Sequence, residues 1–132
     1  MNRFRSLLAM LAVVLSLLVS TAAFAKTPPA EARKIEALIA AVEAQPTAVF
    51  IRNGSEHGAG EAAGHLRLKW RHAGDRIGTA RDFIRYCATK SSFTGRTYRI
   101  RFADGREVDS AAFFLAELER IEKAMVEAGA GL

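Results

Sequence analysis

The chain has 132 residues, of which 50% are hydrophobic and 25% are charged, and its net charge is +5. This length suits one domain and is short for two, and the hydrophobic half excludes a disordered or collagen-like chain. The single cysteine excludes an intrachain disulfide framework and a zinc site built on paired cysteines.

The first 25 residues have the three-part pattern of a secretory signal peptide. Two arginines precede an apolar stretch over residues 6–19, and Ala23-Phe24-Ala25 has the small residues typical of a cleavage site. We therefore expect cleavage between Ala25 and Lys26, a periplasmic or secreted protein, and no stable membrane insertion after cleavage. The competing interpretation is a retained transmembrane anchor, because the apolar stretch is about long enough to span a bilayer.

Charge is distributed unevenly along the rest of the chain. Residues 52–106 carry twelve Lys and Arg against five Asp and Glu, whereas residues 107–132 carry two against six. Outside the cytoplasm, a basic surface predicts an anionic envelope component or an acidic protein as partner, and no nucleic acid. The alternative is that the two regions face each other within the fold.

The first predicted helix follows Thr27-Pro28-Pro29, where threonine can cap and proline suits the first turn. An apolar stripe at positions i, i+3, i+4 and i+7 is formed by Ile35, Leu38, Ile39 and Val42. The helix must end before Gln45-Pro46. Residues 48–51 then predict a short strand, which the Asn53-Gly54 turn closes.

Two further helices are predicted in the centre of the chain. Gly58 followed by Glu61 is half of a capping box and opens a helix that extends to about Ala73. Thr79 followed by Asp82 forms a second capping pattern. The apolar face of the helix that it opens comprises Phe83, Ile84, Cys87 and Ala88. The cysteine is therefore predicted to be a buried thiol, with a dimer disulfide as the alternative.

Residues 97–102 alternate between apolar and polar side chains and predict a strand. A two-residue turn at Asp104-Gly105 would place Val108 on the arginine face of the hairpin. A three-residue loop with Gly105 in the left-handed conformation instead places Val108 opposite Ile100. We predict the second arrangement because it keeps the apolar residues together.

The last predicted helix begins at Asp109 or Ser110 and ends near Gly129. Its apolar stripe is formed by Phe114, Leu118, Ile121 and Met125. Arg99 and Arg101 lie on the outer face of the preceding hairpin. They are expected either to pair with acidic residues of this helix or to form a docking surface for an acidic partner.

The predicted elements are about four amphipathic helices and one short β-hairpin with a strand near residues 97–102. They predict the α+β fold class, dominated by helix, in a single globular domain over residues 26–132. The sequence makes no prediction of an oligomeric state.

Ordered sequence blocks in the centre of the chain resemble a known family. The blocks are Phe50-Ile51-Arg52-Asn53-Gly54, Ala62 to Trp70, Thr79 with Asp82-Phe83-Ile84, and Lys90 to Gly95 with Tyr98. Together they resemble domain-of-unknown-function family 5329, which consists of small secreted proteobacterial proteins of uncharacterised activity. The resemblance implies an envelope address and no particular reaction. Gly58, Gly60 and Gly64 depart from the family pattern, and the last two should weaken their helix by about 1 kcal/mol each.

One candidate site lies on the second helix, where His65 and Lys69 share a face and Glu61 lies one turn before the histidine. The functional interpretation is an anion-binding or proton-transfer edge, with His65 titrating near neutrality. The alternative is a solvated helix edge in which Glu61 pairs with His65.

The polar loop over residues 90–96 also has two interpretations. Its hydroxyl side chains suit a turn in which they bond the local backbone. Alternatively, the loop forms an anion-binding nest to which Lys90 and Arg96 contribute charge. With the turn at Asn53, the candidate ligand-binding residues are Asn53, His65, Lys69, Lys90, Ser91, Ser92 and Arg96.

These residues predict a non-catalytic binding or accessory module that recognises an anionic ligand or an acidic partner surface. The alternative is a small envelope hydrolase that uses His65 with Ser92 or Glu61. No cofactor or metal is expected, because His65 and His72 are roughly 10 Å apart along a helix and cannot share a zinc ion unaided.

Overall fold

The computed structural model describes residues 27–131. The predicted signal peptide and its cleavage site between Ala25 and Lys26 lie outside the described residues. Within residues 27–131, each helix is too short or too polar to cross a membrane.

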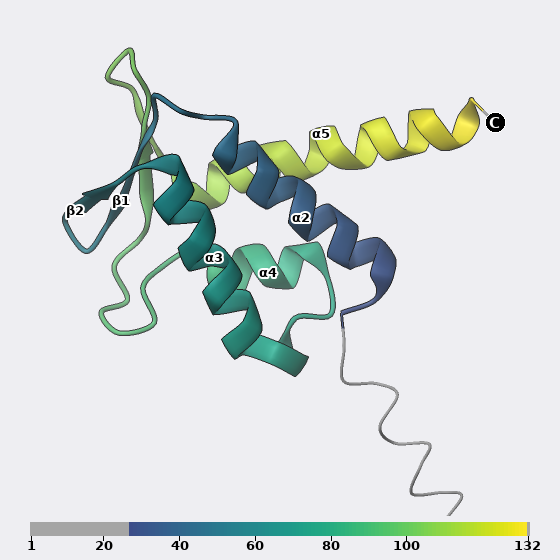
Figure 1. Ribbon diagram of the computed structural model, residues 1–132, viewed down its shortest axis with the longest axis horizontal. Helices are drawn as coiled ribbons and strands as arrows, with labels where there is room; N and C mark the ends of the chain where they lie inside the picture. Colours follow the sequence, from purple (N-terminus) through teal and green to yellow (C-terminus); the bar gives the residue numbers. More distant parts are fainter. Residues whose placement is uncertain (1–26, 132) are drawn as a thin grey trace, which may run out of the picture.

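Helices make up most of the structure, which therefore has the predicted α+β class dominated by helix (Figure 1). The helical elements are α2 (Pro29–Glu43), α3 (Ala59–Ala73), a 3₁₀ turn η2 (Gly74–Arg76), α4 (Ala80–Cys87) and α5 (Ser110–Ala130). Each predicted helix is confirmed within one or two residues of its expected ends. The buried residues of α2 are the four residues of the predicted stripe.

The strands form one antiparallel sheet in the order β2-β1-β3-β4. Their bounds are β1 (Val49–Arg52), β2 (Ser55–His57), β3 (Arg99–Arg101) and β4 (Glu107–Asp109). The sequence predicted one hairpin, and the structure contains a second, β1–β2. Asn53 and Gly54 form its two-residue turn with φ of 52° and 78°, the conformation that such a hairpin turn requires.

The β3–β4 hairpin has the predicted register. Ile100 pairs with Val108, and Gly105 has a φ of 86° in the connecting loop. This conformation is unfavourable for residues with a Cβ, so the loop depends on glycine there. The loop places the apolar side chains of both strands on one face of the sheet.

The core lies between the helices and one face of the sheet. It is centred on Phe83 of α4 and Phe114 of α5, which are 0% and 1% exposed and pack edge to face at 6.4 Å. Cys87 is fully buried, as predicted, and burial raises the pKa of its thiol to about 11. The predicted capping box of α4, formed by Thr79 and Asp82, is confirmed.

The start of α2 differs from the prediction. Thr27 does not cap the helix, because its hydroxyl donates a hydrogen bond of 2.6 Å to the carbonyl of Ile77. Glu31, in the first turn of α2, instead accepts a hydrogen bond of 2.8 Å from the backbone N–H of Ala80. The beginning of α2 is thus fixed to the beginning of α4 by side-chain to backbone contacts.

Candidate functional site

The sheet register determines which side chains face α3. In the β1–β2 and β1–β3 pairs, Phe50 lies opposite both His57 and Ile100. Residues two apart on a strand share a face, so Arg52 lies on the side of Phe50 and Tyr98 on the side of Ile100. Helix α3 contacts β1 and brings His65 to this face.

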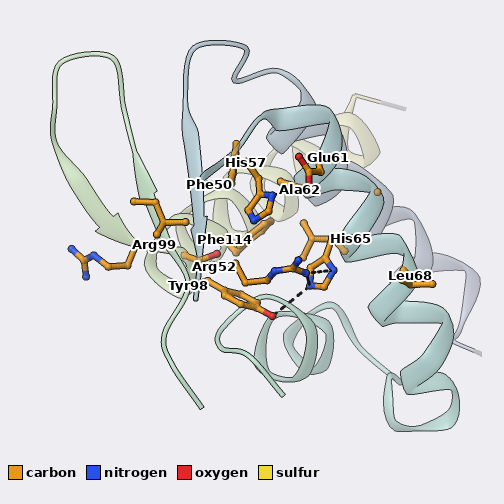
Figure 2. Close-up of a pocket in the computed structure, with 14 residues that line it drawn as sticks. Phe50, Arg52, His57, Glu61, Ala62, His65, Leu68, Tyr98, Arg99 and Phe114 are labelled. Atoms are coloured by element: carbon orange, nitrogen blue, oxygen red, sulfur yellow. Dashed lines mark hydrogen bonds and ion pairs between the residues drawn. The ribbon is translucent and has the colours of Figure 1, made fainter. Parts of the chain in front are cut away.

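His65 lies against Arg52 and Tyr98. The Nη1 atom of Arg52 is 2.6 Å from Nδ1 and 2.9 Å from Nε2 of the imidazole. The hydroxyl of Tyr98 is 3.5 Å from Nε2, and the two rings pack edge to face at 6.3 Å. Figure 2 shows the three side chains together beside α3.

This environment keeps His65 neutral. Burial, together with the positive charges of Arg52 and Lys69 and the neighbouring His57, lowers the pKa of His65 to about 4. A guanidinium only donates hydrogen bonds, so it needs the lone pair of a neutral imidazole. The prediction that His65 titrates near neutrality is therefore wrong.

Lys69 joins α3 to the loop before β3. Its Nζ donates to the backbone carbonyl of Lys90 and to the hydroxyl of Tyr98, each at 3.2 Å. It also lies 5.1 Å from the centre of the Tyr98 ring, within the range of a cation–π interaction. One face of α3 thus holds both predicted residues, His65 and Lys69, next to Tyr98.

The predicted loop and the Asn53 turn contact each other. Asn53 donates to Ser91 Oγ at 3.2 Å, and Thr94 Oγ1 donates to Asn53 Oδ1 at 2.6 Å. Ser91 Oγ also accepts from the backbone N–H groups of Phe93 and Thr94, at 3.3 Å each. These bonds are those of the predicted turn in which hydroxyls bond the local backbone, and Ser91 is only 4% exposed.

The other loop residues of the candidate set lie at the surface. Lys90, Ser92 and Arg96 are exposed. The guanidinium of Arg96 lies beside the hairpin turn. The Nη1 atom of Arg96 is 3.7 Å from the position that a Cβ atom would take at Gly54. The structure therefore brings together the three segments that carry the predicted residues.

We call Arg52, Lys69, Lys90 and Arg96 the basic junction. Among residues 27–131, none of these four side chains forms an ion pair with a carboxylate. Their positive charges therefore lack a partner in the part of the chain that the structure describes.

The outward arginines of the hairpin, in contrast, are paired. Arg99 contacts Asp109 at 2.7 Å and Glu107 at 3.9 Å, and Arg101 contacts Glu56. The expected pairing with the last helix is thus found for Arg99 with Asp109, the N-cap of α5, whereas the partner of Arg101 lies on β2.

A cavity of about 290 Å³ lies between α3 and the sheet, next to the basic junction (Figure 2). Its lining is mainly apolar and includes Phe50, Leu66 and Phe114. The polar groups that it contains are Arg52, His57, Glu61, His65, Tyr98, Arg99 and Ser110.

The sequence did not indicate the position of His57. Its Nδ1 is 2.8 Å from Glu61 Oε1, and its Nε2 is buried without a hydrogen-bond partner within the described structure. Glu61 thus pairs with His57 rather than with His65, contrary to the solvated-edge interpretation. Only the spacing of His57 and Glu61, four residues apart at a helix start, could have suggested this pair.

Metal binding has no geometric support in residues 27–131, where no three His, Cys, Asp or Glu side chains gather in a suitable cluster.

The fold and the site define a small helix-dominated α+β protein with a basic junction beside an apolar cavity. The chain belongs to DUF5329, a family of unknown function whose model matches residues 29–122. This confirms the resemblance seen in the sequence. The range includes α2, the sheet and all seven candidate residues.

A relative in Salmonella typhimurium (strain LT2), named uncharacterized protein YfeK, is 39% identical over 85 residues. The similar region covers 64% of this chain and 71% of the relative. No solved structure is significantly similar to the chain.

Proposed function

We propose that the protein is a non-catalytic binding module of the bacterial envelope that recognises an anionic ligand at the basic junction. The observation that carries this proposal is that four cationic residues stand on β1, α3 and one loop, segments that contact one another, and that their side chains have no carboxylate partners in the described structure. Like charges repel one another, so a bound anion would stabilise this arrangement.

Hydrogen bonds hold part of the basic junction and its neighbours in place. Lys69 is bonded to the Lys90 carbonyl and to Tyr98, and Asn53 is bonded to Ser91. A site that is ordered before binding loses less conformational entropy when the ligand arrives. A small anion is favoured over an acidic protein surface because one cation of the junction, Arg52, lines a cavity of about 290 Å³.

The alternative of a hydrolase has weaker support. His65 contacts Arg52 and Tyr98, while Glu61 contacts His57. Neither His65 nor Glu61 forms a hydrogen bond with Ser92 in the described structure, so the nucleophile and base are not paired.

Titration with inorganic phosphate, followed by amide chemical shifts in NMR spectra, tests the proposal. We expect saturable shifts at Asn53, Lys69 and Ser91, with an affinity that falls as the salt concentration rises. Lys69→Gln should weaken binding severalfold. Arg81→Gln is the matched control, because Arg81 is exposed, carries the same charge and lies on α4. Equal weakening by both variants, or shifts spread evenly over the surface, would contradict the proposal.

The envelope address is also part of the proposal and rests on the sequence pattern of the first 25 residues. Mass spectrometry of the exported protein should find a chain that begins at Lys26. Recovery of the full-length chain from membranes would instead support the transmembrane anchor.

A further inference from the structure

The cavity beside the basic junction contains a polar atom that the proposed anion site does not use. His57 Nε2 is buried and has no hydrogen-bond partner in the described structure, and Figure 2 shows the ring in the cavity. Buried polar atoms in native proteins are nearly always bonded, so an orphaned one in a cavity points to a ligand group. No other buried side-chain nitrogen or oxygen in residues 27–131 lacks a partner.

The contact with Glu61 determines what His57 offers to a ligand. A carboxylate only accepts hydrogen bonds, so the imidazole must carry its proton on Nδ1, 2.8 Å from Glu61 Oε1. In the neutral ring, Nε2 then carries a lone pair that no hydrogen bond within the described structure uses. The complementary ligand group is a hydrogen-bond donor such as a hydroxyl.

The walls of the cavity favour an aromatic ring. Phe50, Phe114 and Tyr98 contribute three rings to the lining, and the apolar side chains Leu66 and Leu68 contribute from α3. Aromatic rings pack favourably edge to face against such walls, and burial of apolar surface adds to the affinity.

Two other residues of the lining offer cationic and hydroxyl donors. Arg52 lines the cavity, and its guanidinium has donors beyond the one at His65. Tyr98 accepts a hydrogen bond from Lys69, so its own O–H group can act as a donor. A carboxylate can accept from both groups at once.

We propose that this cavity binds a small aromatic carboxylate, with its carboxylate at Arg52 and Tyr98, its ring between α3 and the sheet, and a hydroxyl that donates to His57 Nε2. This inference rests on the proposed function, because the carboxylate occupies the edge of the basic junction.

Calorimetric titration of the purified protein with three probes tests the inference. The probes are acetate, phenylpropionate and para-hydroxyphenylpropionate, which add in turn the anion, the ring and the hydroxyl. We expect phenylpropionate to bind at least tenfold more tightly than acetate, because it also buries the ring. The hydroxyl should add a further factor of about ten through one buried hydrogen bond.

Two histidine variants distinguish the loss of the His57 contact from a nonspecific effect of replacing a histidine. His57→Leu should remove the advantage of the hydroxylated probe while phenylpropionate still binds. His72→Leu is the control, because His72 is an exposed histidine of α3 that does not line the cavity. If His57→Leu fails to fold, the comparison of the three probes on the unchanged protein still decides the question.

The outcomes distinguish the two proposals. Equal affinities for acetate and phenylpropionate would overturn the aromatic cavity site and leave the anion site standing. Equal affinities for phenylpropionate and its hydroxylated form would overturn the role of His57. If neither phosphate nor any carboxylate binds, the proposed function itself fails.

Discussion

The α2–α5 contact and the basic junction differ in how their charges are arranged. Between α2 and α5, the ammonium of Lys34 contacts Glu31 at 3.1 Å and Glu122 at 3.3 Å. At the basic junction, Lys69 and Arg52 have no carboxylate partner in the described structure, and Arg52 lines a cavity. In the first region, the charges are paired within the chain itself. Among the described residues, the second region has unpaired positive charges and a cavity, which suit a ligand. The comparison therefore assigns stability mainly to one region and binding to the other.

Truncation of buried and cavity-lining side chains should show the largest difference between the regions. Phe83→Ala, in the closed core, should lower the free energy of unfolding by about 3–5 kcal/mol. Leu68→Ala, at the cavity and 41% exposed, should lower it by less than about 1 kcal/mol. Denaturant unfolding measures both values. Similar losses would mean that the cavity wall is as important for stability as the core.

The carboxylate of Glu31 provides a pH-dependent test of the stable region. The hydrogen bond from the Ala80 N–H, and secondarily the contact with Lys34, hold the pKa of Glu31 below its ordinary value. Its contribution is therefore present above the ordinary carboxyl pKa and is lost as pH falls through the lowered one. Glu31→Gln should cost about 1–2 kcal/mol at neutral pH and less in acid.

The matched control for this change is Glu36→Gln, because Glu36 is an exposed residue of α2 whose carboxylate is 3.9 Å from Arg67. Its effect on unfolding should be below about 0.5 kcal/mol at any pH. If the loss of unfolding free energy in Glu31→Gln does not change with pH, the negative charge of Glu31 does not contribute to its contact with Ala80.

Replacement of a glycine in helix α3, which covers the cavity, should stabilise the protein. Gly64 is exposed on this helix, and a Cβ built there meets no atom within 4 Å. Gly64→Ala should therefore raise the free energy of unfolding by about 1 kcal/mol. Gly74→Ala should have the opposite sign, because Gly74 has a φ of 52°. Thermal unfolding of the two variants checks the sign of each change in stability. A loss of stability in Gly64→Ala would contradict the inference that a Cβ fits at this position without a clash.

The neutral state of His65 makes the site region sensitive to acid. Its pKa is about 4 in the fold and about 6.5 in an unfolded chain, so the unfolded state takes up the proton first. Stability should fall as pH is lowered from about 6.5 to 4, by on the order of 1 kcal/mol because the ring is partly exposed. His65→Gln should flatten the profile in this range. A profile unchanged by this variant would show that His65 is protonated normally.

Much of the fold could be predicted because the signals are local. The stripe from Ile35 to Val42 identified the buried face of α2, and Thr79 with Asp82 identified the start of α4. The choice of register that keeps Val108 with Ile100 was correct because a shift by one residue would expose an apolar side chain.

The second hairpin and the cavity could not be predicted in this way. Strand β2 consists of the polar residues Ser55–His57, which have no apolar alternation to identify them as a strand. The contacts of His65 with Arg52 and Tyr98 depend on pairing between strands that are far apart in the sequence. The sequence indicated that His65 and Lys69 share a face, but not which residues face them.

The most direct test of the central claim is the free energy of unfolding as phosphate replaces chloride at constant ionic strength. An anion that binds only the native state stabilises it by mass action. We expect the free energy of unfolding to rise with phosphate in the unchanged protein and in Arg81→Gln, and this rise to be largely lost in Lys69→Gln. An equal rise in all three proteins, or no rise in any of them, would contradict a specific anion site at the basic junction.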